Sequence, residues 1–274
     1  YCKAIGKSSK DPTMVVQYES HDLFAGGVFA VANHVADFAG QVEMMTVLGR
    51  KDSREDFIRS QLKKNVNASF FYMENAPTTL KRRIVDGGSF NKLFEVYMMD
   101  DSGLVGKEEE LMRSYFNDCV SDYDVAIVAD FGHGAISKRL REDIIKGDIF
   151  TAVNTQANAG NRGFHTISKY SDFNYGCLAL HELELELRNK KDMNLRLEMH
   201  KLLERLNGGV LTVTLGHDGS AAASSGQEYL KVPALSDRIV DRVGAGDALF
   251  AITSLAAAIN APLEVVSFLG SVVG

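Results

Sequence analysis

Hydrophobic and polar positions divide the chain into two kinds of segment. Short apolar runs typical of buried strands end in small or polar residues, at 42–48, 125–129, 150–153 and 210–215. Apolar residues at helical spacing lie between and beside these runs, at 28–38, 55–64, 107–119, 138–146, 194–206 and 248–259. Alternation of strands and helices predicts an α/β fold whose central, mostly parallel sheet carries helices on both faces. Ligands of such sheets bind beyond the carboxyl ends of the strands, so residues that follow a strand are the first candidates for a site.

Two segments depart from this alternation. Residues 13–20 and 78–100 are β-like and contain no helical periodicity. We expect them to form a separate small sheet, a lid over the carboxyl edge of the main sheet. Phe94, Val96 and Met98 share one face of the second segment. Because exposed strand edges and apolar faces favour pairing, this lid also predicts a homodimer surface.

Composition narrows the function classes. The chain has 274 residues, which suits a single domain over 1–274, and its net charge is −6, from 30 Lys and Arg against 36 Asp and Glu. An acidic chain lacks the basic face of a general nucleic-acid binder, and no apolar run approaches the ~18 residues of a membrane span. Cys2, Cys119 and Cys177 are too widely spaced for a disulfide framework or zinc knuckle, which favours the cytoplasm.

The most informative motif is a tight glycine turn before a helix of small residues. A β-like run ends at Asp241, Gly244 and Gly246 allow a sharp bend, and Asp247 falls where the helix starts. The free N–H groups of Gly244, Ala245 and Gly246 would face an anion there, and Asp247 could take a proton from a hydroxyl group as general base. An ordinary helix start with an acidic first turn fits the same residues.

Four further places in the sequence have two readings each. Lys81, Arg82 and Arg83 are either a solvated basic strand face or, with Lys81 and Arg83 on one face, a clamp for a substrate phosphate. Asp130 ends an apolar strand, where it either faces the site or caps the glycine turn that follows. Glu184 would organise Mg²⁺ through water, or it belongs to an exposed acidic helix face. The loop with Asn154, Asn158 and Asn161 is either the rim of the site or a set of turn formers.

Asp241-x-x-Gly244-Ala245-Gly246-Asp247 resembles the C-terminal signature of the ribokinase-like (PfkB) carbohydrate kinases, and other motifs follow in the same order over nearly the whole chain. Gly26-Gly27 with Asn33 resembles the family's substrate element, and Thr214-x-Gly216-x-x-Gly219 resembles its nucleotide turn. Segments 77–84 and 128–135 are similar to the kinase domain of bifunctional heptose-phosphate kinase/nucleotidyltransferase proteins.

The resemblance implies a ribokinase-like three-layer sandwich that uses ATP and Mg²⁺ and phosphorylates a sugar or sugar phosphate. It implies Asp247 as catalytic base and Gly244, Ala245 and Gly246 as the anion hole. The implied substrate residues are Gly26, Gly27, Asn33, Lys81, Arg83 and Asp130. The implied ATP residues are His181, Glu184, Thr214, Gly216, Gly219 and Asp241, with Glu184 also at the metal.

Departures from the family pattern keep other functions open. Ala30 replaces a usual Asn, His133 a usual Lys, His181 the Asn of the nucleotide element and Arg242 a usual small residue. The resemblance also implies that the domain is truncated at both ends, without its first strand and last helices, and is fused to a further domain. The alternatives are a non-catalytic sugar- or nucleotide-binding module of a multidomain enzyme, and a kinase of a free sugar or nucleoside.

Overall fold

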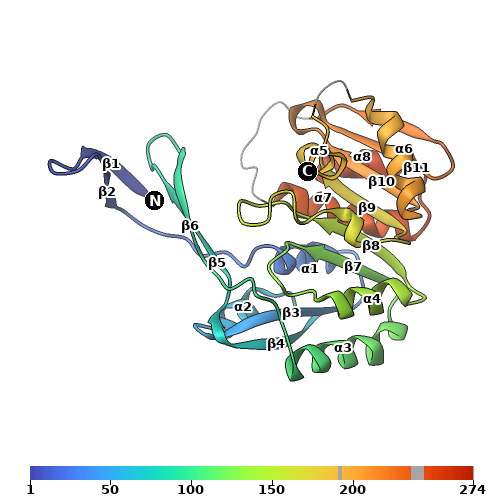
Figure 1. Cartoon of the computed structure of the whole chain (residues 1–274), viewed down its shortest axis with the longest axis horizontal. Coiled ribbons are helices and arrows are strands. Elements are labelled where there is room, and N and C mark those ends of the chain that lie inside the picture. The colour runs from blue at the N-terminus through green and yellow to red at the C-terminus, as the bar shows by residue number, and fades with distance from the viewer. Residues whose placement is uncertain (191–192, 236–243, 274) are drawn as a thin grey trace.

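The computed structural model describes residues 1–190, 193–235 and 244–273. Its centre is a six-stranded sheet in the order β12-β11-β10-β9-β8-β7 (Figure 1). The four strands β7 to β10 run parallel, and β11 and β12 add an antiparallel edge. The strands of this sheet are β7 (Val125–Asp130), β8 (Phe150–Thr155), β9 (Tyr175–Ala179), β10 (Val210–Thr214), β11 (Ser220–Ser224) and β12 (Tyr229–Val232).

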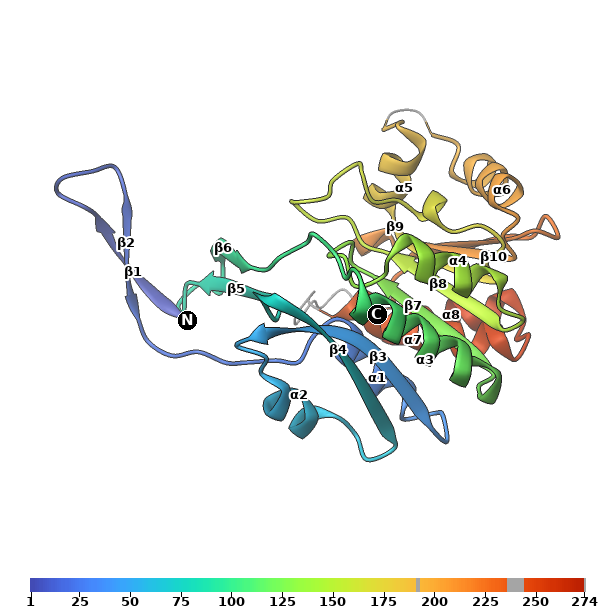
Figure 2. The ribbon, with the colours of Figure 1, turned by 60° about the horizontal axis from the view of Figure 1, so that its bottom comes forward.

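Helices cover both faces of this sheet, as Figure 2 shows. Because side chains alternate along a strand, Val153 of β8 packs into the core under α3, α4, α5 and α6, whereas Ala152 packs against α7 and α8. The predicted α/β architecture is therefore confirmed. The helices are α1 (Val28–Val35), α2 (Glu55–Gln61), α3 (Lys107–Cys119), α4 (Lys138–Lys146), α5 (Leu180–Leu187), α6 (Leu195–Leu206), α7 (Ala245–Ala258) and α8 (Leu263–Val273). Among the described residues, no helix is long and apolar enough to cross a membrane.

The first strand of the predicted central sheet lies in a sheet of its own. β3 (Val42–Lys51) pairs in parallel with β4 (Val66–Pro77), and these two strands form a two-stranded sheet. A cavity of about 2230 Å³ is lined by residues of β3, α1 and β7. The cavity extends to Asp247 and Gln156, so the space beside α1 and the ends of the central strands are continuous.

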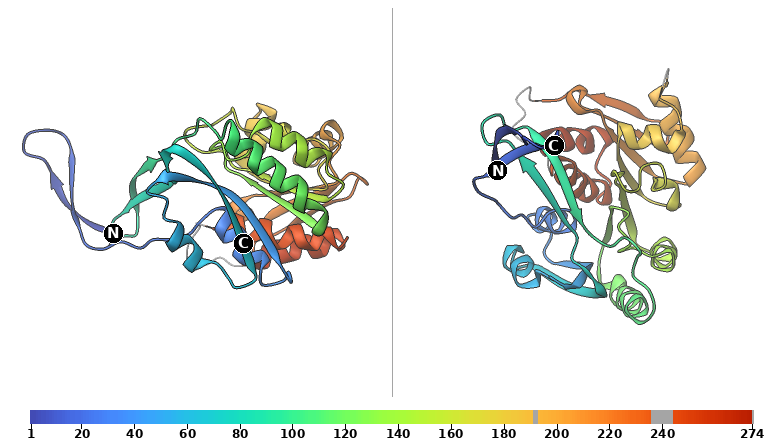
Figure 3. Two further views of the ribbon diagram at one scale, coloured as in Figure 1. Left: turned by 90° about the horizontal axis from the view of Figure 1, so that it is seen from below. Right: turned by 60° about the vertical axis from the view of Figure 1, so that its left-hand side comes forward.

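The two β-like segments are strands, but they do not form one sheet. β2 (Met14–Tyr18) pairs with β1 (Cys2–Lys7), and β5 (Leu80–Val85) pairs with β6 (Lys92–Met98). The expectation of a single lid sheet is thus wrong, because each segment finds its partner in its own hairpin. The hairpins meet where Cys2 bridges to Asp86, and together they form an arm that projects from the main body (Figure 3).

Candidate active site

The glycine turn after the undescribed segment 236–243 leads directly into α7. Gly244 caps the helix in the left-handed region, with φ of 88°, a conformation that glycine adopts without a Cβ penalty. The helix begins at Ala245 rather than Ala248, and its first hydrogen bond joins the Ala248 N–H to the Gly244 carbonyl oxygen at 2.9 Å. The N–H groups of Ala245, Gly246 and Asp247 therefore lie at the positive end of the helix dipole, as an anion site requires.

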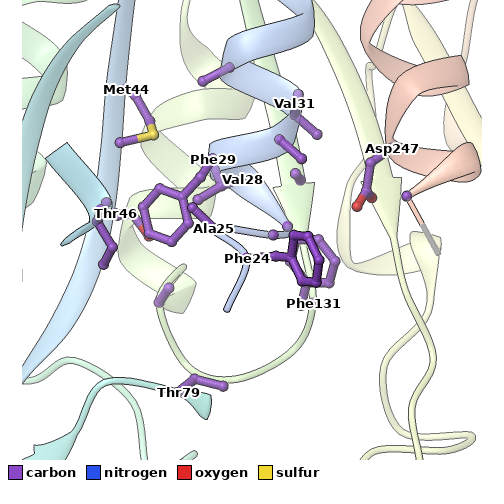
Figure 4. Close-up of a pocket in the computed structure, with 18 of the residues that line it drawn as sticks. Phe24, Ala25, Val28, Phe29, Val31, Met44, Thr46, Thr79, Phe131 and Asp247 are labelled. Atoms are coloured by element: carbon purple, nitrogen blue, oxygen red, sulfur yellow. The ribbon is translucent and has the colours of Figure 1, made fainter. Parts of the chain in front are cut away.

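Asp247 occupies the first turn of α7, and its carboxyl group is directed into the pocket of Figure 4. The side-chain amide of Gln156 donates to Asp247 Oδ1 at 2.8 Å. Burial raises the pKa of Asp247 above its ordinary value, while the Gln156 hydrogen bond and the neighbouring His34 of α1 act in the opposite direction. The carboxyl is thus partly withdrawn from water and held by a neutral donor.

The Gly26-Gly27 pair leads into α1 beside this pocket. Gly27 is the N-cap residue of α1, and a Cβ there would lie 3.2 Å from the Phe131 ring. Both glycines line the cavity, together with Ala30 and His34. The structure therefore places the predicted substrate element opposite the loop that follows β7.

Asn33 is not part of the site, which corrects its prediction as a substrate residue. Its side chain donates to the Gln61 carbonyl oxygen at 2.9 Å and accepts from the Lys63 N–H at 3.0 Å, so it joins α1 to the end of α2. Its helix neighbours Ala32 and His34 line the cavity, whereas the Asn33 amide is used by the end of α2 and the residues that follow it.

Both side-chain oxygens of Asp130 accept hydrogen bonds from nearby residues of the protein. Tyr170 donates its hydroxyl to Asp130 Oδ2 at 2.7 Å, and the Gly132 N–H donates to Oδ1 at 2.9 Å. His165 also lies 2.9 Å from the Asp130 carbonyl oxygen. Burial and the Asp130 charge raise the pKa of Tyr170, so the phenol stays a donor. These contacts favour the turn-forming reading of Asp130.

Lys81 and Arg83 share one face of β5, as strand alternation predicts, but their surroundings differ. Lys81 is half-buried, with Nζ 5.1 Å from the Tyr97 ring centroid, and burial followed by the nearby Arg83 charge lowers its pKa. Burial and the charge of Lys81 lower the pKa of His133, so these two basic side chains lie close together, and both line the cavity. Arg83 instead donates from Nε to Glu95 Oε1 at 2.9 Å. Only Lys81 of the predicted pair is therefore without a bonded carboxylate in the described structure.

The nucleotide motif lies at the same edge of the sheet, beyond β10. Ala179 at the end of β9 pairs with Thr214 at the end of β10, and Asp130 pairs with Thr155 at the ends of β7 and β8. After Thr214, residues Gly216–Asp218 form a 3-10 turn that leads into β11. Thr214 thus ends β10, and Gly216 and Gly219 follow it; β9 lies between this strand and β8, which leads to Gln156. Asp241 and Arg242 lie outside the described residues.

The structure brings Glu182, rather than Glu184, to the loop after β8. Glu182 is buried, and its two oxygens accept the N–H groups of Ala157 and Ala179, both at 2.8 Å. Burial raises the pKa of Glu182, and these two N–H groups act in the opposite direction. Two residues on, Glu184 is rotated by about 200° around the helix, away from that loop. His181 is exposed, with His181 Nε2 3.9 Å from Glu182 Oε1.

Sequence reasoning missed Gln156, Glu182 and His34. Gln156 lies three residues after the strand predicted over 150–153. Residues just beyond a strand are candidates for a site, so this position could have been noticed. Glu182 falls at the third position of α5, where a glutamate commonly reaches back to the cap, and this spacing was readable in advance. Within residues 1–190, 193–235 and 244–273, no group of three or more His, Cys, Asp or Glu residues could hold a metal ion.

The chain resembles known proteins along almost its entire length. A family model described as pfkB family carbohydrate kinase matches residues 3–274. The bifunctional protein HldE of Pseudomonas aeruginosa (strain UCBPP-PA14) is 26% identical over 269 residues, which are 96% of this chain and 53% of that protein. The bifunctional protein HldE of a Nitratiruptor species is 23% identical over 252 residues, 92% of this chain and 52% of that protein. The chain thus spans about half the length of the curated relatives it matches.

Solved structures show the same fold. Phosphofructokinase-2 from Escherichia coli in complex with fructose-6-phosphate superposes with a TM-score of 0.74 at 14% identity, covering 98% of this chain and 86% of that one. The ribokinase of Arabidopsis thaliana complexed with ribose and ATP gives a TM-score of 0.70 at 14% identity, covering 98% and 85%. The predicted ribokinase-like fold is confirmed.

Proposed function

Because the chain belongs to the pfkB family of carbohydrate kinases, we propose that it transfers the γ-phosphoryl group of ATP to a hydroxyl group of a phosphorylated sugar. The observation that carries this proposal is the position of Asp247. Its carboxyl group is directed into the pocket from the first turn of α7, next to the N–H groups that begin the helix. A base for the hydroxyl proton and an anion site for the transferred group thus lie within one helical turn.

In the proposed reaction, the sugar hydroxyl oxygen attacks the γ-phosphorus and its proton moves to Asp247. The bond between the γ-phosphorus and the bridging oxygen breaks, and ADP leaves with the electron pair. The N–H groups of Ala245 and Gly246 are suited to stabilise the negative charge on the equatorial oxygens. The protein contributes mainly by positioning the reactants and stabilising charge, because phosphoryl transfer requires little covalent participation by protein groups.

The sugar would lie between the start of α1 and the loop after β7. Gly26 and Gly27 both line the cavity; the Phe131 ring packs over Gly27, whereas a Cβ at Gly26 would have nothing within 4 Å, so the room for a sugar ring lies beside Gly26. Lys81 and His133, which lie close together, also line the cavity and supply basic groups. An ammonium group binds phosphate as a point charge, which favours a substrate that already carries a phosphate.

ATP would lie along the edge formed by β9 and β10, with Thr214, Gly216 and Gly219 beside the nucleotide. Glu182 offers a carboxylate at the loop after β8, and Mg²⁺ is usually bound by one or two carboxylates together with substrate phosphates and water. Both oxygens of Glu182 already accept main-chain N–H groups, so Mg²⁺ would be held mainly by the ATP phosphates and water, and we propose Glu182, in place of Glu184, as the carboxylate nearest to it. Bound Mg²⁺ would neutralise charge on the ATP phosphates.

A kinase of a free sugar is the second candidate. The pairing of Arg83 with Glu95 favours it, because this pairing withdraws one cation of the predicted phosphate clamp. The non-catalytic alternative is disfavoured by the placement of Asp247, which a pure binding module would not need.

The test is an ATP-consumption assay with pairs of sugars that differ only in a phosphate group, using the longest natural form of the protein. Hexoses and heptoses are offered as free sugars and as monophosphates, and products are identified by phosphorus NMR. We expect turnover with one or more monophosphates and at least tenfold lower kcat/KM with the free partner. Preference for the free sugar would select the second candidate, and no turnover with any sugar would refute the proposed function.

A further inference from the structure

Gln156 is the first residue after β8, and both its main chain and its side chain contact the candidate active site. Its main-chain N–H donates to the Asp130 carbonyl oxygen at 2.9 Å, which holds the backbone against the end of β7. From this anchored position, its side-chain Nε2 donates to Asp247 Oδ1 at 2.8 Å. An ionised carboxylate only accepts hydrogen bonds, so the amide must present its NH₂ group here.

Three elements present groups to Asp247 around this contact. α1 presents His34, the loop after β8 presents Gln156, and β9 presents Cys177. Burial raises the pKa of Cys177 to about 12, so this thiol is uncharged. In the part of the chain that the structure describes, no lysine or arginine forms an ion pair with Asp247. The amide of Gln156 is the side-chain donor that the structure records on this carboxylate.

We propose that Gln156 is a positioning residue, which holds Oδ1 of Asp247 and leaves Oδ2 directed into the pocket to receive the substrate proton. This inference rests on the proposed function of Asp247 as a general base. It assigns the selection between two chemically equal oxygens to a side chain that does not touch the reacting atoms. A base works only within hydrogen-bond reach of its proton, so the orientation of one oxygen matters for rate.

A neutral donor suits this position better than a cation would. Burial raises the pKa of Asp247, and the hydrogen bond from Gln156 acts against that rise, so the carboxylate can be ionised at neutral pH. A lysine or arginine at the same place would stabilise the ionised form more strongly and thereby make Asp247 a weaker base. An amide fixes the geometry while leaving Asp247 most of its basicity.

The test compares Gln156→Leu and Gln156→Glu with the matched controls Gln61→Leu and Gln61→Glu. Gln61 is exposed at the end of α2, where its side chain donates to Ser60 Oγ at 3.2 Å, so the controls make the same chemical changes outside the site. The pKa of Asp247 is measured by carboxyl-carbon NMR in each variant, and kcat, KM and the pH profile are measured with ATP and the sugar. Thermal unfolding checks that each variant is folded.

Loss of a hydrogen bond to a charged group should raise the pKa of Asp247 by about one to two units in Gln156→Leu. The acidic limb of kcat should move to higher pH by the same amount. At the plateau kcat should fall by roughly 10–100-fold, as expected for a displaced catalytic group, with the ATP KM unchanged. Gln156→Glu should raise the pKa further, because two carboxylates then face each other. The controls should match the wild type.

The variant Asp247→Asn with Gln156→Leu separates positioning from a structural role. If Gln156 acts through Asp247, adding Gln156→Leu to Asp247→Asn should cost less than twofold in the remaining turnover. Additive losses, or an unchanged Asp247 pKa in Gln156→Leu, would overturn the inference. The NMR measurement does not need turnover. A protein without kinase activity would therefore refute the proposed function while the pKa shift still tested the contact.

Discussion

Lys81→Met removes the half-buried cation that lines the proposed substrate cavity, and it should weaken binding of a sugar phosphate while leaving ATP binding intact. Lys81 lies on β5 next to His133 and the Tyr97 ring, whereas the nucleotide turn follows β10. A hydrogen bond to a charged group contributes about 1.5–3 kcal/mol. With 1.4 kcal/mol per factor of ten, the KM for the sugar phosphate should rise about 10–150-fold.

Arg83→Met is the matched control on the same strand face. Arg83 is already paired with Glu95 and is more than one third exposed, so screening by water limits its effect to that of a surface ion pair. Its sugar-phosphate KM should therefore change less than about fivefold. The assay measures KM for ATP and for the sugar phosphate in both variants, with unfolding temperatures to check stability. Equal losses for the two ligands, or equal effects of the two substitutions, would refute the reasoning.

Three further outcomes are expected. Gly132→Ala should lower the unfolding temperature far more than Gly163→Ala in thermal melts. Both residues have positive φ, but a Cβ at Gly132 would lie 2.3 Å from the side chain of a neighbouring asparagine, whereas nothing lies within 4 Å at Gly163. Turnover should fall on acidification at a higher pH than an ordinary aspartate would give. In the proposed mechanism Asp247 acts in its ionised form, and its raised pKa brings protonation nearer neutrality, so a pH–rate profile with an unshifted acidic limb would contradict this. Phe94→Lys with Val96→Lys on the arm should convert a dimer to a monomer in sedimentation experiments, because both side chains are exposed, and a wild-type monomer would refute the dimer surface.

Helices with a strong polar and apolar face were predictable to the residue. The segments Lys107–Cys119 and Lys138–Lys146 begin and end where their periodicity does. By contrast, β1 was not predicted, because Cys2–Lys7 has no strand-like alternation and is extended through its pairing with β2. The conformation of this segment depends on its pairing with another strand, and such pairing cannot be read from the residue pattern of a single sequence.

The chemical motifs predicted that several candidate residues lie near one another, but not the contacts that they make. The glycine turn correctly predicted that Asp247 lies at a helix start, because a turn and a helix start depend on residues that are adjacent in the sequence. The contact from Gln156 joins residues 91 positions apart, so no short motif encodes it. Asn33 was misplaced for a related reason. A motif gives the distance along the chain but not the partner of a side chain, and the Asn33 amide bonds to Gln61 and Lys63 instead.

The most direct measurement of the central claim is the turnover of Asp247→Asn beside that of Asp148→Asn. Asp148 is exposed at the amino end of β8, so its substitution makes the same chemical change at the opposite edge of the sheet. With ATP and the best sugar substrate, Asp247→Asn should lose about 10²–10⁴ in kcat while ATP binding by calorimetry stays within a factor of three and Asp148→Asn stays fully active. Near-normal turnover of Asp247→Asn would remove this carboxylate from the chemistry and contradict the proposed mechanism.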